Sequence, residues 1–256
     1  MTAAPASLGR RQRRLALLAS VLVAALVPGI LVVNGLRLLA NDWYVHAEYA
    51  RPGFPPDHLG ILTEEQRIDL ALIGLRSIQP QHDEGVQLLR DARLPDGTPA
   101  FNDREVQHMQ DVRDLVGGFY WAHIGSLILL VLLLAALART PATRRYVPRA
   151  LLGGVGFMVA LAAVVGIMMA VAFDWFFTAF HHAFFEGMTW YFYRGDTLLR
   201  IYPNRFWNDF GFVLGGVAVV QAIVLAGGCW WWIRRTRRRE AVAPRREPVG
   251  APAPEA

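Results

Sequence analysis

Residues 151–173 read LLGGVGFMVALAAVVGIMMAVAF and contain no charged side chain. An α-helix rises about 1.5 Å per residue, so a stretch of about 20 apolar residues crosses the ~30 Å hydrocarbon core of a bilayer. Three further stretches have this length and composition, namely residues 15–40, 119–138 and 210–233. The sequence therefore predicts an all-α membrane protein with four transmembrane helices.

The composition of the whole chain agrees with this class. Of the 256 residues, 54% are hydrophobic and 18% charged, and the mean hydropathy of +0.28 is too high for an ordinary soluble enzyme. All 26 basic residues are arginine. They lie beside the apolar stretches, so no nucleic-acid partner is predicted. The single cysteine, Cys229, excludes an internal disulfide framework and a cysteine-based metal site.

The distribution of arginine predicts the topology. Residues 1–14, 139–150 and 234–256 carry 15 arginines against 3 acidic residues, and the rest of the chain carries 11 against 18. Short arginine-rich segments stay in the cytoplasm. Both termini and the 139–150 loop are therefore expected to be cytoplasmic, and residues 41–118 and 174–209 to form two helical segments on the outer face.

The two ends of the chain carry further signals. Residues 15–40 exceed the 7 to 15 apolar residues of a signal-peptide core, so this stretch is expected to remain as a membrane anchor. The tail, residues 234–256, is rich in proline and arginine and is expected to be disordered. Small residues in the third and fourth spans, including Gly154 and Gly211, predict close helix packing.

Residues 41–118 carry two helix starts. Thr63 with Gln66 fits a capping box, and Asn102 with Glu105 fits a second. A turn is expected between them at Pro95-Asp-Gly97. No strong break follows Asn102 before Gly117, so the second helix is expected to continue directly into the span at 119–138.

His108 lies on that second helix. Asp111 follows at i+3, and Val112 and Leu115 at i+4 and i+7 form an apolar stripe on the same face. The histidine therefore faces protein or lipid. Asp111 could accept a hydrogen bond from one ring nitrogen of His108, which would leave the other nitrogen as a base near neutral pH. The same spacing also fits an ordinary surface pair.

Residues 174–209 are rich in aromatic side chains, as expected at a membrane interface. Helical spacing places His181 on one stripe with Phe177, Phe184 and Phe185, while His182 falls on the polar face. A histidine among phenylalanines is partly desolvated, which favours the neutral base. His182 is expected to have a supporting role.

The remaining polar residues of this segment have alternative interpretations. Arg200 and Arg205 could bind lipid phosphates or a peptide carbonyl, or could simply extend to the interface. Asp174 could orient a histidine or mark the membrane edge. No nucleotide-binding loop and no HExxH motif occurs in the sequence.

Together these motifs resemble a known family. The shared pattern comprises His108-Met-x-Asp111-Val, Phe177-x-x-Phe180-His181-x-x-Phe184-Phe185, Trp190, Asp196 and Pro203-x-x-Phe206-Trp. On four helices with two outer segments, this pattern resembles the bacterial lipoprotein intramolecular transacylases, over roughly residues 40–233. Two features depart from it, the second adjacent histidine, His182, and the arginine-rich tail.

The resemblance implies a multi-pass enzyme of the bacterial cytoplasmic membrane, with its site toward the outer face. Its substrate would be the diacylglyceryl-modified N-terminus of a lipoprotein. The enzyme would move the sn-2 acyl chain to the α-amino group of the modified cysteine, leaving a lyso-form lipoprotein. His108 and His181 would share the acid and base roles and Asp111 would orient His108, with no cofactor and no metal.

The resemblance also implies the surroundings of the reaction. Membrane lipid would surround the site, and substrate-binding residues would come from Trp190, His182, Asp196, Arg200 and Arg205.

Two other classes remain open from the residues alone. A membrane zinc-dependent hydrolase could use the outer histidines with an aspartate as ligands. A non-enzymatic membrane scaffold, or a haem protein with two histidine ligands, is the second class. A haem would need two facing histidines inside the bundle, and only His123 lies near a helix interior.

Overall fold

The computed structural model describes residues 8–242, and the regular secondary structure of these residues consists of helices and one isolated β-bridge between Arg93 and Pro99. The helices are α1 (Arg10–Leu39), α2 (Asp42–Tyr49), α3 (Glu64–Ser77), α4 (Gln87–Asp91), α5 (Asp103–Ala138), α6 (Pro141–Arg144), α7 (Tyr146–Phe184), α8 (Thr197–Ile201) and α9 (Asn204–Val242). The predicted all-α class is confirmed for these residues.

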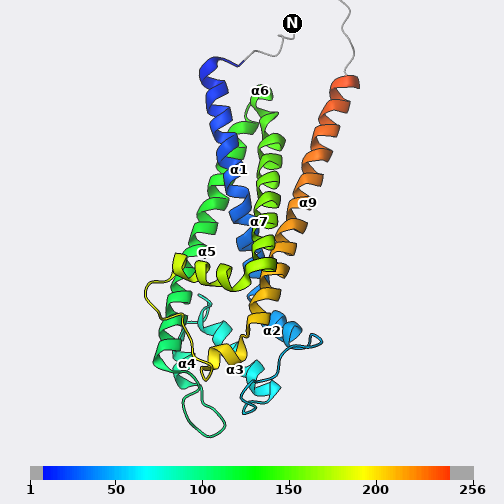
Figure 1. Cartoon of the computed structure of the whole chain (residues 1–256). Helices are drawn as coiled ribbons and strands as arrows, with labels where there is room; N and C mark the ends of the chain where they lie inside the picture. Colours follow the sequence, from blue (N-terminus) through cyan, green and yellow to red (C-terminus); the bar gives the residue numbers. More distant parts are fainter. Residues whose placement is uncertain (1–7, 243–256) are drawn as a thin grey trace, which may run out of the picture.

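Four helices, α1, α5, α7 and α9, are long and apolar enough to cross a membrane, which confirms the four predicted spans (Figure 1). Large apolar side chains such as Val171 and Val224 are 77% and 70% exposed on them, as expected for surfaces that face lipid rather than water. The described ends of α1 and α9 lie at the same end of the bundle (Figure 1). We call this end the termini end and the opposite one, which carries α2, α3, α4 and α8, the domain end.

Helix α9 is longer than the sequence predicted. It continues past residue 233 to Val242, so the prediction of a disordered tail from residue 234 is wrong for residues 234–242. Arginine is a good helix former, and no glycine or proline interrupts this stretch to end the helix. Residues 243–256, like residues 1–7, lie outside the described residues.

Helix α7 also extends past its predicted end at residue 173, but it changes direction there. Ala172 has non-helical dihedral angles (φ −149°, ψ 49°). The helical residues that follow, drawn in yellow-green in Figure 1, lie across the end of the bundle instead of continuing along it. The predicted interfacial segment therefore begins with a crosswise helix, Phe173–Phe184, that carries His181.

Close packing joins the spanning helices where small residues meet. A Cβ atom on Gly154 would lie 2.6 Å from the Cβ of Val27, so α7 approaches α1 closely only because this residue is glycine. Gly211 on α9 faces the side chain of Met169 on α7. Polar contacts add to this packing, because the Gln221 amide donates to the Leu31 carbonyl and accepts from Asn34.

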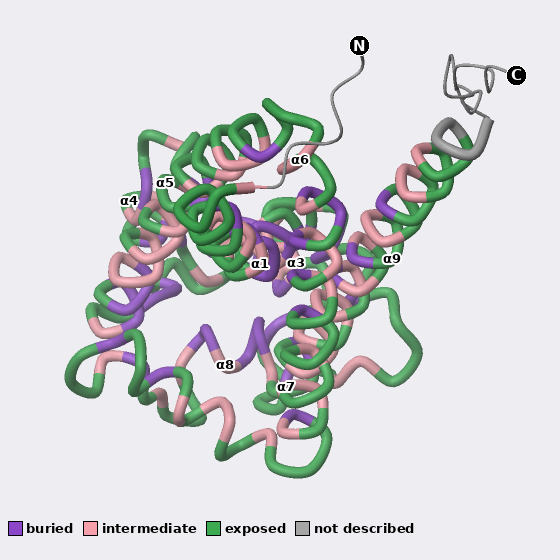
Figure 2. Tube along the Cα trace, turned by 90° about the horizontal axis from the view of Figure 1, so that it is seen from above, coloured by how far each residue is buried: buried purple, intermediate pink, exposed green. Residues whose placement is uncertain are grey.

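The domain end has its own hydrophobic core, contributed by α2, α3, α4, α8 and the first turns of α5 and α9. Buried tyrosines hold it together, since the Tyr49 hydroxyl donates to the Ile201 carbonyl and the Tyr202 hydroxyl to the Ala71 carbonyl. Figure 2 shows buried segments at the centre and exposed ones around them. This core fixes the first turns of α5, and hence the position of His108.

Both predicted capping boxes and the predicted turn are present. The side chains of Thr63 and Asn102 each accept a hydrogen bond from the third residue of their helix, and the side chains of Gln66 and Glu105 accept one from the backbone N–H of the cap residue. The turn at residues 95–97 closes with Gly97 at φ +84°, a conformation that favours glycine. Helix α5 then runs unbroken from Asp103 into the bundle, as predicted.

Candidate active site

His108 lies in the first turns of α5, where the helix still belongs to the domain end. The surrounding residues 103–114 include several charged side chains, which places this part of α5 outside the apolar span. The His108 side chain is nevertheless buried, because Phe185 and Phe192 pack against its ring with centroids 5.0 and 5.2 Å away. A histidine on an otherwise polar stretch of helix is thus enclosed by aromatic rings from another segment.

His181 comes from the crosswise helix of α7 and meets His108. The two rings stack with centroids 5.9 Å apart and an angle of 29° between their planes. His181 is also buried, and its Nδ1 atom lies 2.7 Å from the Phe177 carbonyl oxygen. A carbonyl oxygen only accepts, so Nδ1 carries the proton and the Nε2 lone pair of the neutral ring is left available.

Burial sets the protonation of both rings. Desolvation, with a smaller contribution from His181, lowers the pKa of His108 to about 4, and the Asp111 carboxylate opposes this shift. Desolvation also lowers the pKa of His181, while its hydrogen bond to Phe177 opposes the shift. Both histidines are therefore neutral at physiological pH, the form in which an imidazole can accept a proton.

Asp111 does not play the part expected from its spacing. The predicted hydrogen bond from His108 is not formed, and Nδ1 of His108 is buried without a partner among the described residues. The Asp111 carboxylate instead accepts hydrogen bonds from Gln107 and from the hydroxyl of Thr189, at 2.9 and 3.0 Å. The reason is that residues 185–196 place the Thr189 hydroxyl beside the Asp111 carboxylate. Helical spacing cannot predict this contact, because the two residues lie on different segments.

Trp190 packs against His181 and His182. Its ring centroid lies 5.1 Å from that of His181 and 5.0 Å from that of His182. The indole is buried, and its Nε1–H has no hydrogen-bond partner in the described part of the chain. A buried donor without an acceptor costs about 1–3 kcal/mol, so this group is unsatisfied as it stands. His182 itself is exposed and touches the site only through Trp190.

The other predicted binding residues lie in structural interactions. Asp196 accepts hydrogen bonds from Asn102, Arg104 and the Tyr193 backbone. These bonds attach residues 185–196, which we call the aromatic segment, to the start of α5. Arg205, which is partly exposed, binds Asp209 and the carbonyl oxygens of residues 52 and 53. Neither contact reaches the histidine pair.

Arg200 is the clearest departure from the predicted set. Its side chain is 3% exposed, and Nε and one terminal nitrogen donate to the two carboxylate oxygens of Asp57 at 3.0 and 2.9 Å. This ion pair and the two backbone hydrogen bonds to Asp57 hold the pKa of that carboxyl well below its usual range, against the effect of its burial. With its charge neutralised inside the domain end, Arg200 is not free to hold a lipid phosphate. Asp174 lies on the first turn after the kink.

Comparison with known proteins identifies this arrangement. A model of the family described as lipoprotein intramolecular transacylase Lit matches residues 83–207, the stretch that holds both histidines. A protein of Aquifex aeolicus (strain VF5), described only as uncharacterized, is 31% identical over 192 residues, which cover 75% of this chain and 84% of that protein. The chain belongs to the lipoprotein intramolecular transacylase family.

The transacylase also shares its fold with solved members of that family. The structure of the integral membrane transacylase Lit from Bacillus cereus aligns with a TM-score of 0.69 and 15% identity, covering 89% of this chain and all of that one. A mutated form of the same B. cereus protein aligns with a TM-score of 0.66 and 14% identity, covering 90% and 96% of the two chains. The chain is thus a multi-pass integral membrane enzyme.

Two neighbours of the histidines were not anticipated from the transacylase sequence. Thr189 contacts Asp111, and Phe192 contacts His108. No helical or strand spacing in the sequence links the two members of either pair. For the zinc alternative, no group of three or more histidine, cysteine, aspartate or glutamate side chains within residues 8–242 is arranged to hold a metal ion. The two histidines meet as a pair and gain no third ligand.

Proposed function

We propose that this transacylase performs intramolecular O-to-N acyl transfer on bacterial lipoproteins. The substrate is the diacylglyceryl-modified N-terminal cysteine, and the sn-2 acyl chain moves from the glycerol oxygen to the α-amino nitrogen of the same molecule. The observation that carries the proposal is the pair of buried, neutral histidines, His108 and His181, on two different helices at one end of the bundle.

The reaction needs a base and an acid, which such a pair can supply. An α-amino group has a pKa of about 7.7–8.0, so near neutral pH it must lose a proton before it attacks the ester carbonyl. A new N–C bond then forms, the C–O bond to glycerol breaks, and the departing oxygen takes up a proton. General acid and base catalysis contributes about 10²- to 10⁴-fold to such steps, and holding both groups on one molecule contributes further.

His181 suits the role of the base. Its Nδ1–H donates a hydrogen bond to the Phe177 carbonyl, which holds the ring in one tautomer. The atom that accepts the proton is therefore Nε2. His108, whose nitrogens have no hydrogen bonds within the described residues, donates the N–H proton of its neutral ring to the leaving oxygen. It regains a proton from the protonated His181, so both rings end neutral. Asp111 has a positioning role, because it fixes residues 185–192 through Thr189 rather than His108 directly.

Trp190 completes the proposed site. Its unpartnered indole N–H, beside the His181 ring, supplies one hydrogen bond to the ester carbonyl oxygen as negative charge develops there. The surrounding phenylalanines, including Phe180 and Phe185, supply an apolar wall for the acyl chain. Arg200 and Arg205 stabilise the domain end and are left out of substrate binding in this proposal.

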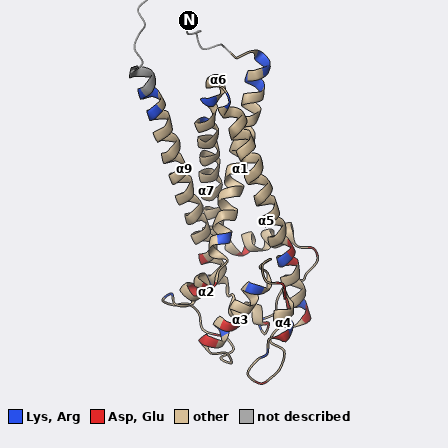
Figure 3. Ribbon diagram, turned by 180° about the vertical axis from the view of Figure 1, so that it is seen from behind, with Lys and Arg blue, Asp and Glu red and all other residues tan. Residues whose placement is uncertain are grey.

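The orientation in the membrane follows from the charges. At the termini end, the coloured part of the ribbon in Figure 3 carries arginine positions, and no aspartate or glutamate occurs there up to residue 238, a pattern typical of cytoplasmic loops. We therefore propose that both termini face the cytoplasm and that the histidine pair faces the outer side, where mature lipoproteins expose their N-terminus.

The test uses mass spectrometry on a reporter lipoprotein in a host that lacks N-acylation of its own. Expressing the wild-type chain is expected to give an acyl group on the cysteine nitrogen and a monoacylglyceryl thioether. His181→Asn and His108→Asn are expected to leave the diacylglyceryl cysteine unchanged. His46→Asn, which alters an exposed histidine without hydrogen bonds in the described residues, serves as the matched control.

An unmodified reporter with well-expressed wild-type protein would contradict the proposed reaction. Full product from both histidine variants would contradict the proposed roles and favour another site on the same fold. A monoacylglyceryl thioether without an acyl group on the nitrogen, formed only when zinc is present, would favour the hydrolase class instead.

A further inference from the structure

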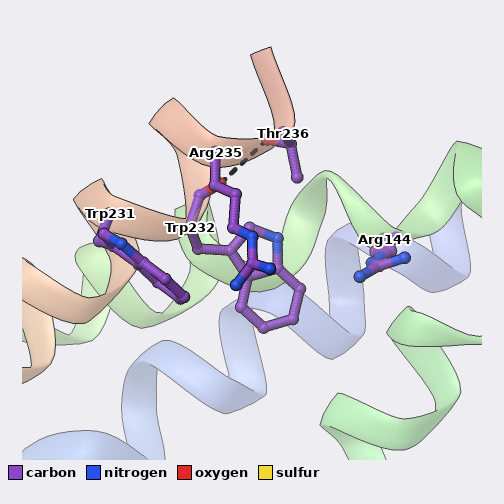
Figure 4. A pocket seen from close by; sticks show the side chains of 5 residues that line it. All are labelled: Arg144, Trp231, Trp232, Arg235 and Thr236. Atoms are coloured by element: carbon purple, nitrogen blue, oxygen red, sulfur yellow. Dashed lines mark hydrogen bonds between the residues drawn. The ribbon is translucent and has the colours of Figure 1, made fainter. Parts of the chain in front are cut away.

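A second concave site lies at the termini end, far along the bundle from the histidines. It is a pocket of about 330 Å³ between α6 and α9, lined by Arg144, Trp231, Trp232, Arg235 and Thr236 (Figure 4). Figures 1 and 2 both show the end of α9 diverging from the other helices. The proposed acyl transfer makes no use of the pocket.

The wall of the pocket is aromatic and firmly held. Trp232 packs against a buried cluster of α1, α5 and α7 that includes Ala16 and Val147. The Arg144 guanidinium lies 5.4 Å from the centroid of the Trp232 ring, and that of Arg235 lies 5.1 Å from Trp231. Each guanidinium is thus steadied over an indole while its N–H groups remain available.

Neither arginine has an acidic partner among the side chains that the structure describes, which end at residue 238 on α9. All ion pairs found there belong to the domain end. The sequence explains this, because it contains no acidic residue between Asp114 and Asp174 or between Asp209 and Glu240. The guanidinium groups of Arg144 and Arg235 are therefore expected to attract an anion that these segments do not supply.

We propose that the pocket binds the phosphate group of an anionic phospholipid. The two guanidinium groups supply charge-assisted hydrogen bonds to the phosphate oxygens, the geometry that arginine favours. The indole faces of Trp231 and Trp232 pack against the glycerol and the first carbons of the acyl chains. Basic pockets between spanning helices are known to bind such headgroups.

The apolar wall favours a lipid over free phosphate. Trp231 in the pocket is 58% exposed, and Val224, seven residues earlier on the same face of α9, is 70% exposed. A lipid can bury part of this surface, whereas inorganic phosphate gains only the two charges.

The test is native mass spectrometry of the purified full-length chain in a neutral detergent. Phosphatidylglycerol and phosphatidylcholine with the same acyl chains are titrated separately. We expect tighter binding of phosphatidylglycerol, and a loss of about tenfold to a hundredfold in its affinity in the double variant Arg144→Gln, Arg235→Gln. Arg234→Gln is the matched control, because Arg234 lies over Trp230 and outside the pocket. It is expected to change affinity by less than about twofold.

Three results would overturn the proposal. Equal losses in the double variant and in Arg234→Gln would indicate a diffuse charge effect rather than a site. Unchanged binding in the double variant would place the lipid elsewhere. Competition by inorganic phosphate at the same concentration as the lipid would identify a phosphate site instead.

Separate control measurements test whether the variants fold and remain active. Transacylation of the reporter and the melting temperature of the variants show whether they fold. If the double variant does not, the single change Arg235→Gln carries the test.

Discussion

Thr189 donates a hydrogen bond of 3.0 Å to Asp111, and this bond ties the aromatic segment to α5 one turn beyond His108. Trp190, the next residue, covers His181, while Phe185 and Phe192 pack on His108. Together with the contacts of Asp196, this bond thus positions the residues that enclose both histidines. The carboxylate acts on the site through this segment, at a distance from the reacting atoms.

Replacing Thr189 by valine keeps the shape and removes the donor. We expect transacylation to fall about tenfold or more, because misplacing groups around a reaction by about 1 Å costs up to 10²-fold. The free energy of unfolding should fall by only about 1 kcal/mol. The matched control is Gln110→Ala, which breaks a similar 2.9 Å hydrogen bond to Asp114 on the same helix without touching the segment. Equal activity in the two variants would contradict the positioning role.

Trp190→Phe separates stability from activity. The change keeps an aromatic ring but removes the unpartnered N–H, so the folded protein should be as stable or up to about 1 kcal/mol more stable. If the N–H serves the developing oxyanion, the turnover rate should fall about 10²- to 10³-fold. Trp175→Phe, at a side chain 62% exposed, controls for general effects of losing a tryptophan. A variant that is less stable and fully active would disprove the assignment.

The lowered pKa of His108 predicts how stability depends on pH. The folded protein keeps this ring neutral down to about pH 4, whereas an unfolded histidine takes up its proton near a pKa of about 6.5. Between these values the unfolded state binds more protons, so the free energy of unfolding falls as the pH falls and is unaffected above about pH 7. At about pH 5 the loss amounts to about 2 kcal/mol.

The measurement compares melting temperatures in detergent at about pH 7.5 and about pH 5. The drop on acidification should be smaller in His108→Gln than in the wild type, because that variant has no proton to exclude at this position. The same drop in both proteins would mean that other groups account for the acid sensitivity.

The buried pair of Arg200 and Asp57 predicts a loss of stability rather than of substrate affinity. Arg200→Gln leaves the Asp57 carboxylate buried without its counter-ion, which costs about 3–5 kcal/mol. Arg205→Gln, which removes a partly exposed ion pair with Asp209, should cost at most about 1 kcal/mol. Thermal unfolding of the two variants gives the comparison. Normal melting of Arg200→Gln together with a raised KM would restore Arg200 to a substrate-binding role.

The contact between Gly154 and Val27 predicts that the third span tolerates no larger residue there. Gly154→Ala should destabilise the bundle by about 1–3 kcal/mol, because the new methyl group would overlap Val27. Gly156→Ala, two residues away and facing open space, should be neutral or stabilising by up to about 1 kcal/mol. Adding Val27→Ala to Gly154→Ala should recover part of the loss. Unfolding temperatures of the four proteins test the contact.

Much of this architecture is predictable from local patterns. The apolar stretches predict the spans, and the caps at Thr63 and Asn102 predict where α3 and α5 begin, because both signals act within a few residues. The family resemblance rests on motifs that do lie together in space, since His108 and His181 stack.

Long-range pairing is what the patterns miss. The ion pair of Arg200 joins it to Asp57 in an irregular stretch 143 residues earlier, and no spacing rule links the two positions. Thr189 reaches Asp111 in the same way, across 78 residues. The change of direction at Ala172 depends on what surrounds α7, because the sequence there reads as an uninterrupted apolar helix.

That change of direction limits how this part of the chain can evolve. An α-helix turns by about 100° per residue, so one residue inserted or lost between Ala172 and His181 would rotate the histidine away from His108 toward the lipid. Substitutions in this interval can be absorbed, but changes of length cannot. Alignments of active homologues should therefore show variable residues and a constant count between the bend and the histidine, with gaps confined to the loops of the domain end.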